Sequence, residues 1–102
     1  IRLCRDLSGR IVRVFFAWPG VTLDAQGLAA YEFARTMWAE NSRYSTRRQQ
    51  WTFVRDCLKE AARMAEDAGV ILALQNHVPL LRHYRDMLDM IAEVDSPALR
   101  AG

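Results

Sequence analysis

The sequence lacks the runs and residue patterns that mark specialised classes of protein. No apolar run approaches the roughly 20 residues that a membrane-spanning helix needs, and the opening IRLCRDLSGR contains no apolar signal region. A net charge of +2 is too small to indicate binding to nucleic acid or to an anionic membrane. With 51% hydrophobic and 25% charged residues, the composition is that of an ordinary soluble domain, which we expect in the cytoplasm.

Cysteine is also scarce. Cys4 and Cys57 are far apart in the sequence, and each falls in a helix-like pattern. The chain contains no CxxC pair and no Cys/His cluster of the kind that binds structural zinc. We therefore predict two reduced thiols rather than a disulfide.

The first part of the sequence predicts a helix end followed by a buried strand. Residues 1–9 have the apolar spacing of the last turns of a helix, and Gly9 is expected to take the left-handed position after it. Residues 10–18, RIVRVFFAW, are rich in β-branched and aromatic side chains and almost continuously apolar. This pattern is typical of a strand covered on both faces, and Pro19-Gly20 ends it.

A long helical connection follows. Asp24 is a candidate cap for a helix that runs to about Glu40, and the SRYST segment interrupts it. Ser45 or Thr46 can cap a second helix, predicted at Arg47–Ala68, that Gly69 ends. Apolar residues recur in this second helix at steps of three and four and predict its core-facing stripe: Trp51, Val54, Leu58, Ala61, Ala65 and Ala68.

The last third of the sequence predicts a strand, a loop and a helix. Residues 70–75 are apolar up to their last position, and the loop NHVPLLR follows. A helix is predicted at His83–Val94, and Asp95-Ser96-Pro97 stops it. The residues expected to face the core from this helix are Tyr84, Met87, Leu88 and Ile91.

Strands that alternate with helices predict βαβ units, a parallel sheet and a right-handed crossover. Two strands cannot make a stable parallel sheet that is covered on both faces. We therefore expect the chain to be a central piece of a longer protein, or its missing strands to come from another copy. Free strand edges also predict self-association.

Three polar residues, Gln75, Asn76 and His77, follow the second predicted strand directly. In parallel α/β proteins, ligands meet the carboxyl ends of the strands, so these residues are candidates for a binding site. Trp18 ends the earlier strand and is a second candidate. The alternative is that Asn76 and His77 simply begin a loop.

Two segments, DCLKEAARMAEDAGVILALQNH at 56–77 and YRDMLDMIAEVDSPALRAG at 84–102, resemble the xylose isomerase-like TIM barrels. This superfamily includes the sugar phosphate isomerases/epimerases and the apurinic endonuclease family 2 relatives. Its usual phrase is a helix ending A-x-x-x-G-V, a strand L-A-L-E-N-H and a helix closing on V-x-S-P-x-L; RIVRVFFAW is similar to the preceding strand. The resemblance implies a partial (β/α)8 barrel of about two β/α units, with an extra helix in the connection.

The resemblance also implies a site. In the family, the Glu of E-N-H binds a divalent metal (Mn, Mg, Co or Zn), and here Gln75 replaces it. A glutamine oxygen can coordinate a cation but carries no charge and cannot act as a base. His77 and Trp18 are the expected substrate-binding residues, and Asn76 is expected to point away from the site with a structural role. None of these residues is expected to be catalytic.

The function implied is that of a metal-dependent sugar isomerase or epimerase, with a small sugar as the substrate. A full barrel needs about 250 residues, so this piece alone is not expected to be active. Lyase or hydrolase chemistry on the same barrel is an alternative. A non-catalytic binding module that has lost the metal-binding Glu is another. The arginines of RYSTRRQQW (43–51) either bind a phosphate at a helix N-terminus or form a solvated face.

Overall fold

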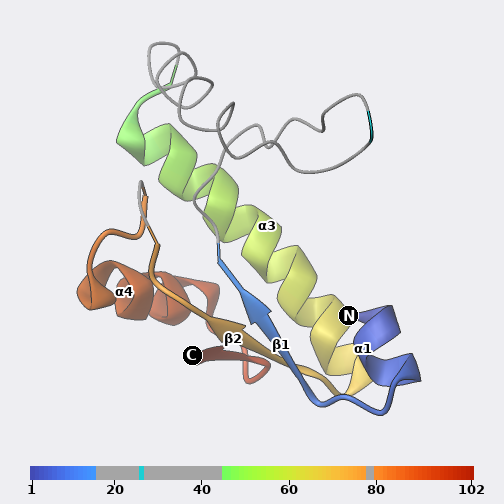
Figure 1. Cartoon of the computed structure of the whole chain (residues 1–102). Coiled ribbons are helices and arrows are strands. Elements are labelled where there is room, and N and C mark those ends of the chain that lie inside the picture. The colour runs from blue at the N-terminus through green and yellow to red at the C-terminus, as the bar shows by residue number, and fades with distance from the viewer. Residues whose placement is uncertain (16–25, 27–44, 78–79) are drawn as a thin grey trace.

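The computed structural model of the chain describes residues 1–15, 26, 45–77 and 80–102. Among these residues, the helices and strands follow in the order α1 (Arg2–Asp6), β1 (Ile11–Val14), α3 (Arg47–Ala68), β2 (Ile71–Leu74), α4 (Tyr84–Val94) and β3 (Leu99–Ala101), as Figure 1 shows. The helix predicted at 24–40 lies outside the described residues.

The three strands form one parallel sheet in the order β1-β2-β3. Val12 pairs with Leu72, and Leu72 pairs with Leu99, so the strands are in register along their full length. The predicted α/β class with a parallel sheet is thereby confirmed. The strand β3 was not predicted, because three residues, Leu99–Ala101, are too few to show a strand periodicity.

Helices α3 and α4 cover one face of this sheet. Val12 and Val14 of β1 pack against the same core cluster that contains Leu72 and Leu74 of β2. Alternate residues of a strand point to the same side, so these valines and leucines lie together on one face of the sheet. Its buried members are Leu58, Ala62, Ala65, Leu72, Leu74, Leu81, Met87, Met90, Val94, Ala98 and Leu99.

The ends of α3 are those expected from the sequence. Thr46 is the N-cap: its hydroxyl accepts a hydrogen bond from the Gln49 N–H at 3.2 Å, and the Gln49 side chain accepts one from the Thr46 N–H at 2.8 Å. This reciprocal pair satisfies two N–H groups that a helix start leaves without partners. Gly69 ends the helix in a left-handed conformation, with φ of 66°.

The core-facing side of α4 differs from the prediction. Tyr84 and Leu88 were expected to face the core, but their side chains are 51% and 47% exposed. Met87 is buried and Ile91 packs against the core, as predicted, but Met90 and Val94 are buried as well. The helix is therefore rotated so that Met90 takes the central position that the sequence analysis gave to Leu88.

The prediction for the first strand was wrong in its burial. β1 spans only Ile11–Val14, and Ile11 is 66% exposed, whereas a strand covered on both faces would bury it. β1 is an outer strand of the sheet, and no described helix packs on the face to which Ile11 belongs. Residues 16–18 of the predicted strand lie outside the described residues.

The role predicted for Gly9 was also wrong. After α1 the left-handed conformation is taken by Ser8, with φ of 59°, and not by Gly9. Gly9 is needed for space instead, because a Cβ there would lie 2.7 Å from the Sγ of Cys4.

Cys4 and Cys57 are both free thiols, as predicted. Among the described helices, none has the length and apolar content to cross a membrane.

Replacing Met90 by Ala is expected to lower the free energy of unfolding by about 2–5 kcal/mol, because a fully buried side chain leaves a cavity. Leu88→Ala on the same helix is the matched control, and we expect a change of about 0.5 kcal/mol or less from this exposed position. Urea denaturation followed by circular dichroism measures both. A larger loss for Leu88→Ala than for Met90→Ala would show that α4 is rotated as the sequence alone suggested.

Candidate functional site

The second face of the sheet carries the predicted site. Because strand residues alternate between the two faces, the residues that do not join the core point away from α3 and α4. Figure 1 shows β1 and β2 side by side and running in the same direction. We call this second side the open face; its residues are Ile11, Arg13, Phe15, Ile71, Ala73, Gln75 and Arg100.

Gln75 lies at the carboxyl end of β2, as predicted. Its backbone N–H donates to the Val14 carbonyl at 2.9 Å, so the ladder of β1 and β2 continues one residue past the strand. The side chain is half-buried, neither sealed in the core nor fully in solvent. Its amide makes no hydrogen bond to any described residue. The amide is therefore available as both donor and acceptor.

His77 is fixed by two contacts. Its ring stacks on Phe15, with ring centroids 5.5 Å apart and an interplanar angle of 27°. Its carbonyl accepts a hydrogen bond from the Leu81 N–H at 3.1 Å, in an isolated antiparallel bridge. The structure thus brings His77 to the same rim as Gln75, two residues further along the chain.

Phe15 is the rim residue that sequence reasoning missed. It follows β1 directly, and its ring is 40% exposed. The register pairs Val14 with Leu74, which places Phe15 beside Gln75. The signal was present in the sequence, because Phe15 lies two residues after Arg13 and so on the same face of the strand. It was read as part of a continuous buried run instead.

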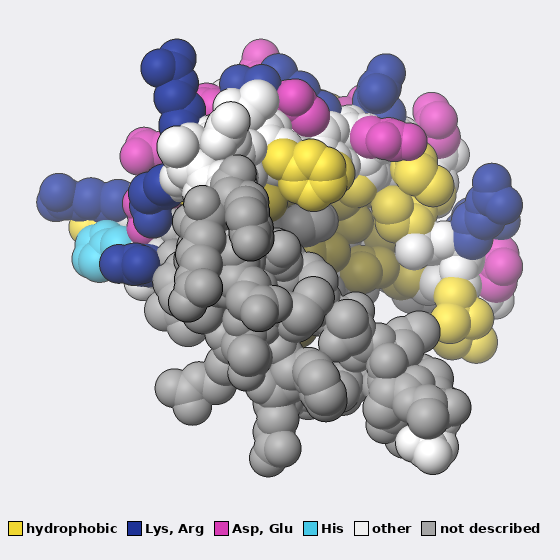
Figure 2. All heavy atoms as spheres, turned by 90° about the horizontal axis from the view of Figure 1, so that it is seen from above, with side chains coloured by type: hydrophobic (Ala, Val, Ile, Leu, Met, Phe, Trp, Pro, Cys, Tyr) yellow, Lys and Arg dark blue, Asp and Glu magenta, His cyan; other side chains and the backbone are white. Residues whose placement is uncertain are grey.

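The remaining predicted site residues do not join this group. Asn76 is exposed. Trp18 lies outside the described residues. Figure 2, seen from above, shows hydrophobic side chains gathered in a recess, with charged side chains above it and to its right.

The described residues do not make a metal centre. Among them there is no group of three or more His, Cys, Asp or Glu side chains that could hold a metal ion. Gln75 offers a single neutral oxygen, and a divalent cation such as Mg²⁺ or Ca²⁺ needs several oxygen ligands. Further ligands would have to come from outside the described part of the chain.

Arg47, at the start of α3, makes a contact between two helices. The Arg47 guanidinium donates to Asp86 at 2.9 Å, and the other oxygen of Asp86 accepts from the backbone N–H of His83 at 2.9 Å. Arg43 lies outside the described residues. This contact joins the N-terminus of α3 to that of α4, so Arg47 has a structural partner and is not held ready for a phosphate.

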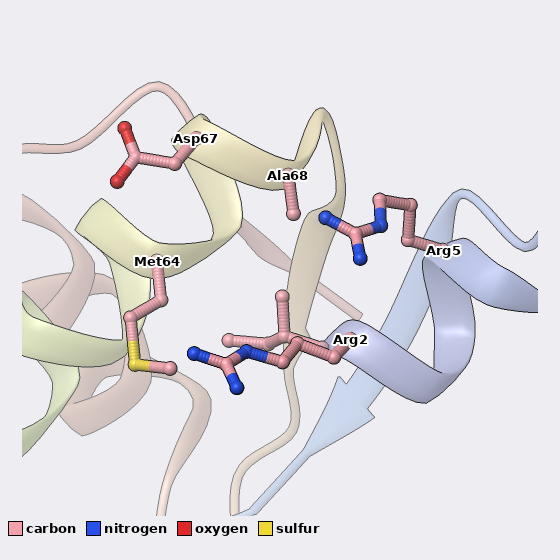
Figure 3. A pocket seen from close by; sticks show the side chains of 6 residues that line it. Arg2, Arg5, Met64, Asp67 and Ala68 are labelled. Carbon is pink, nitrogen blue, oxygen red and sulfur yellow. The ribbon is translucent and has the colours of Figure 1, made fainter.

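A cavity of about 230 Å³ lies at the other end of the sheet, between α1 and the last turn of α3. In Figure 3, Arg5 extends from α1 toward Ala68, and Arg2 extends toward Met64. The C-terminal end of a helix carries partial negative charge and attracts guanidinium groups. The arginines therefore complement the end of α3, and the cavity is not part of the Gln75 rim.

Comparison with models of protein families, with curated proteins and with solved structures finds no match to this chain. The resemblance to the xylose isomerase-like barrels therefore rests on the residues of the sequence alone.

Proposed function

We propose that this chain is a section of a (β/α)8 barrel whose carboxyl rim binds a sugar. One observation carries the proposal: three parallel strands lie in sequence order, and both α3 and α4 pack on the same face. In such a barrel each strand is followed by a helix, and all the helices pack on the same outer face of the sheet. A doubly wound sheet instead has helices on both faces of the full sheet. The open face would then be the inner wall.

The rim residues have the chemistry that sugar binding requires. The Phe15 ring supports the proposal because an exposed aromatic surface can cover the apolar C–H face of a sugar. The Gln75 amide can donate to one hydroxyl and accept from its neighbour. His77 offers a third polar group, held in place by its stack on Phe15.

We infer an isomerase or epimerase activity for the complete barrel, acting on a sugar or sugar derivative in the cytoplasm. Among the three rim residues, His77 alone can transfer a proton, because an amide and a phenyl ring cannot. A base and the remaining groups would come from strands outside the described residues. Lyase or hydrolase chemistry on the same inner wall is the alternative reaction class.

Replacing Gln75 by Ala is expected to weaken binding of xylose by about two- to tenfold, the contribution of one or two neutral hydrogen bonds. The measurement is a titration followed by the backbone amide resonances of Phe15, Gln75 and His77 in nuclear magnetic resonance spectra. Asn76→Ala is the matched control, since alternation along the chain predicts that Asn76 points away from Gln75, and it should leave the affinity unchanged. Xylose-induced shifts that are absent from the rim, or equal losses in both variants, would contradict the proposal.

A second candidate function is a binding module without turnover, and the replacement of the family's Glu by Gln75 favours it. Isothermal titration of the complete barrel with Mn²⁺ separates the two candidates. For the enzyme, we expect binding at micromolar Mn²⁺, tightened about tenfold by Gln75→Glu because the added charge raises cation affinity. If micromolar Mn²⁺ binds only after Gln75→Glu, the binding module is the correct assignment.

We also propose that the chain associates with itself through its strand edges. β1 and β3 are the outer strands, and neither outer edge pairs with another described strand. Ile11, on β1, is 66% exposed. Unpaired edges with apolar side chains favour pairing between copies.

Sedimentation velocity should show a dimer whose fraction rises with protein concentration. Ile11→Lys should shift the chain toward the monomer, because a lysine on an edge strand opposes pairing. Phe53→Lys, on the exposed side of α3, removes a similar apolar surface away from the edge and should have no effect. A monomer at every concentration would overturn the proposal.

A further inference from the structure

We propose that Arg13 and Arg100 form an anion-binding site on the open face, which takes a carboxylate or phosphate group of the sugar ligand. This inference deepens the proposed function and rests on it, since it assumes that the ligand enters from the rim at Gln75. The inference adds a negative charge to the ligand. The rim residues Phe15, Gln75 and His77 would bind a neutral sugar equally well.

The two arginines share one row of the sheet. Arg13 pairs with Ala73, and Ala73 pairs with Arg100, so one small residue separates them. Neighbouring strands lie about 4.8 Å apart, which places the two Cα atoms roughly 9.5 Å from each other. Arginine side chains that start at this separation on one face can converge on a single anion.

The side chain of Arg13 leans toward the rim. Its guanidinium carbon lies over the Phe15 ring, 5.7 Å from the ring centroid, and Phe15 in turn stacks on His77. The row of Arg13 and Arg100 is two residues below that of Gln75, which is about 6.7 Å along a strand. A sugar at the rim therefore has its anionic substituent within reach of the guanidinium groups.

Neither arginine has a negative partner among the described residues. Arg47 pairs with Asp86, and Arg55 with Asp56, whereas Arg13 and Arg100 are both exposed and take part in no such ion pair. The described residues of the open face include no Asp or Glu. Both guanidinium groups are therefore open to an anionic ligand.

The residues beside the two arginines are small. Ala73 is the floor of the row, and Gly102 approaches it so closely that a Cβ on Gly102 would lie 2.9 Å from the Cβ of Ala73. The backbone N–H groups of β2 are used in the ladder, so recognition here must come from side chains.

The guanidinium group suits this role because its planar fork donates two parallel hydrogen bonds to a carboxylate or a phosphate. Both anions share this chemistry, and the two sources are separated by the choice of probe. The probes are glucose, glucuronate, glucose 6-phosphate and inorganic phosphate, each titrated calorimetrically into the full chain.

We expect at least one of glucuronate and glucose 6-phosphate to bind about tenfold or more tightly than glucose, the gain of one charge-assisted pair. Arg13→Gln and Arg100→Gln should each remove most of this difference. Arg63→Gln, an exposed arginine on α3, is the control for general electrostatics and should change nothing. Circular dichroism melts verify that each variant is folded, and Arg13→Lys, which keeps the charge but loses the fork, should retain part of the gain.

Anionic sugars that bind no more tightly than glucose would overturn the inference, as would an equal loss in Arg63→Gln. An acidic side chain from another strand that already neutralises the pair would produce the first of these results. Inorganic phosphate distinguishes this failure from that of the proposed function. If the arginine variants lose phosphate while Gln75→Ala leaves glucose binding unchanged, the anion site stands and the sugar rim is wrong. If Gln75→Ala weakens glucose binding but the arginine variants bind phosphate as tightly as the unchanged chain, the sugar rim stands and the anion site is wrong.

Discussion

The packing of α3 and α4 on one face of the parallel sheet determines everything else in this structure. Val12, Leu72 and Leu99 lie side by side in register and are covered by helical residues such as Leu58 and Met90. Hydrophobic burial of this row fixes the register, because a shift by one residue would exchange the two faces of a strand. Once the register is fixed, the opposite face and its polar residues are fixed as well.

The candidate site is a direct consequence of that register. Phe15 and Gln75 are neighbours only because Val14 pairs with Leu74, and His77 reaches Phe15 only because β2 runs parallel to β1. The same register puts Arg13 and Arg100 on either side of Ala73. A single apolar row therefore places a polar rim above a basic row, and the proposed sugar and anion sites both depend on it.

Local signals in the sequence predicted the boundaries of the elements well. Thr46 and Gly69 mark the ends of α3 through hydrogen bonding and backbone conformation that depend on nearby residues alone. Burial was predicted less well. Leu88 and Met90 are both apolar and both fit a helical stripe, and only the position of the sheet decides which of them is buried. Ser8 takes the left-handed conformation expected of Gly9, and Gly9 leaves room for Cys4.

The sequence by itself determined the α/β class, the parallel pairing of its strands and the polar tip at Gln75 and His77. These features follow from periodicity, capping residues and the end of an apolar run, which are all local properties. Only the tertiary structure decided that Phe15 holds His77, that β3 joins the sheet and that two arginines share one row. Such contacts join residues far apart in the chain, and their formation depends on strand register, which no local pattern encodes.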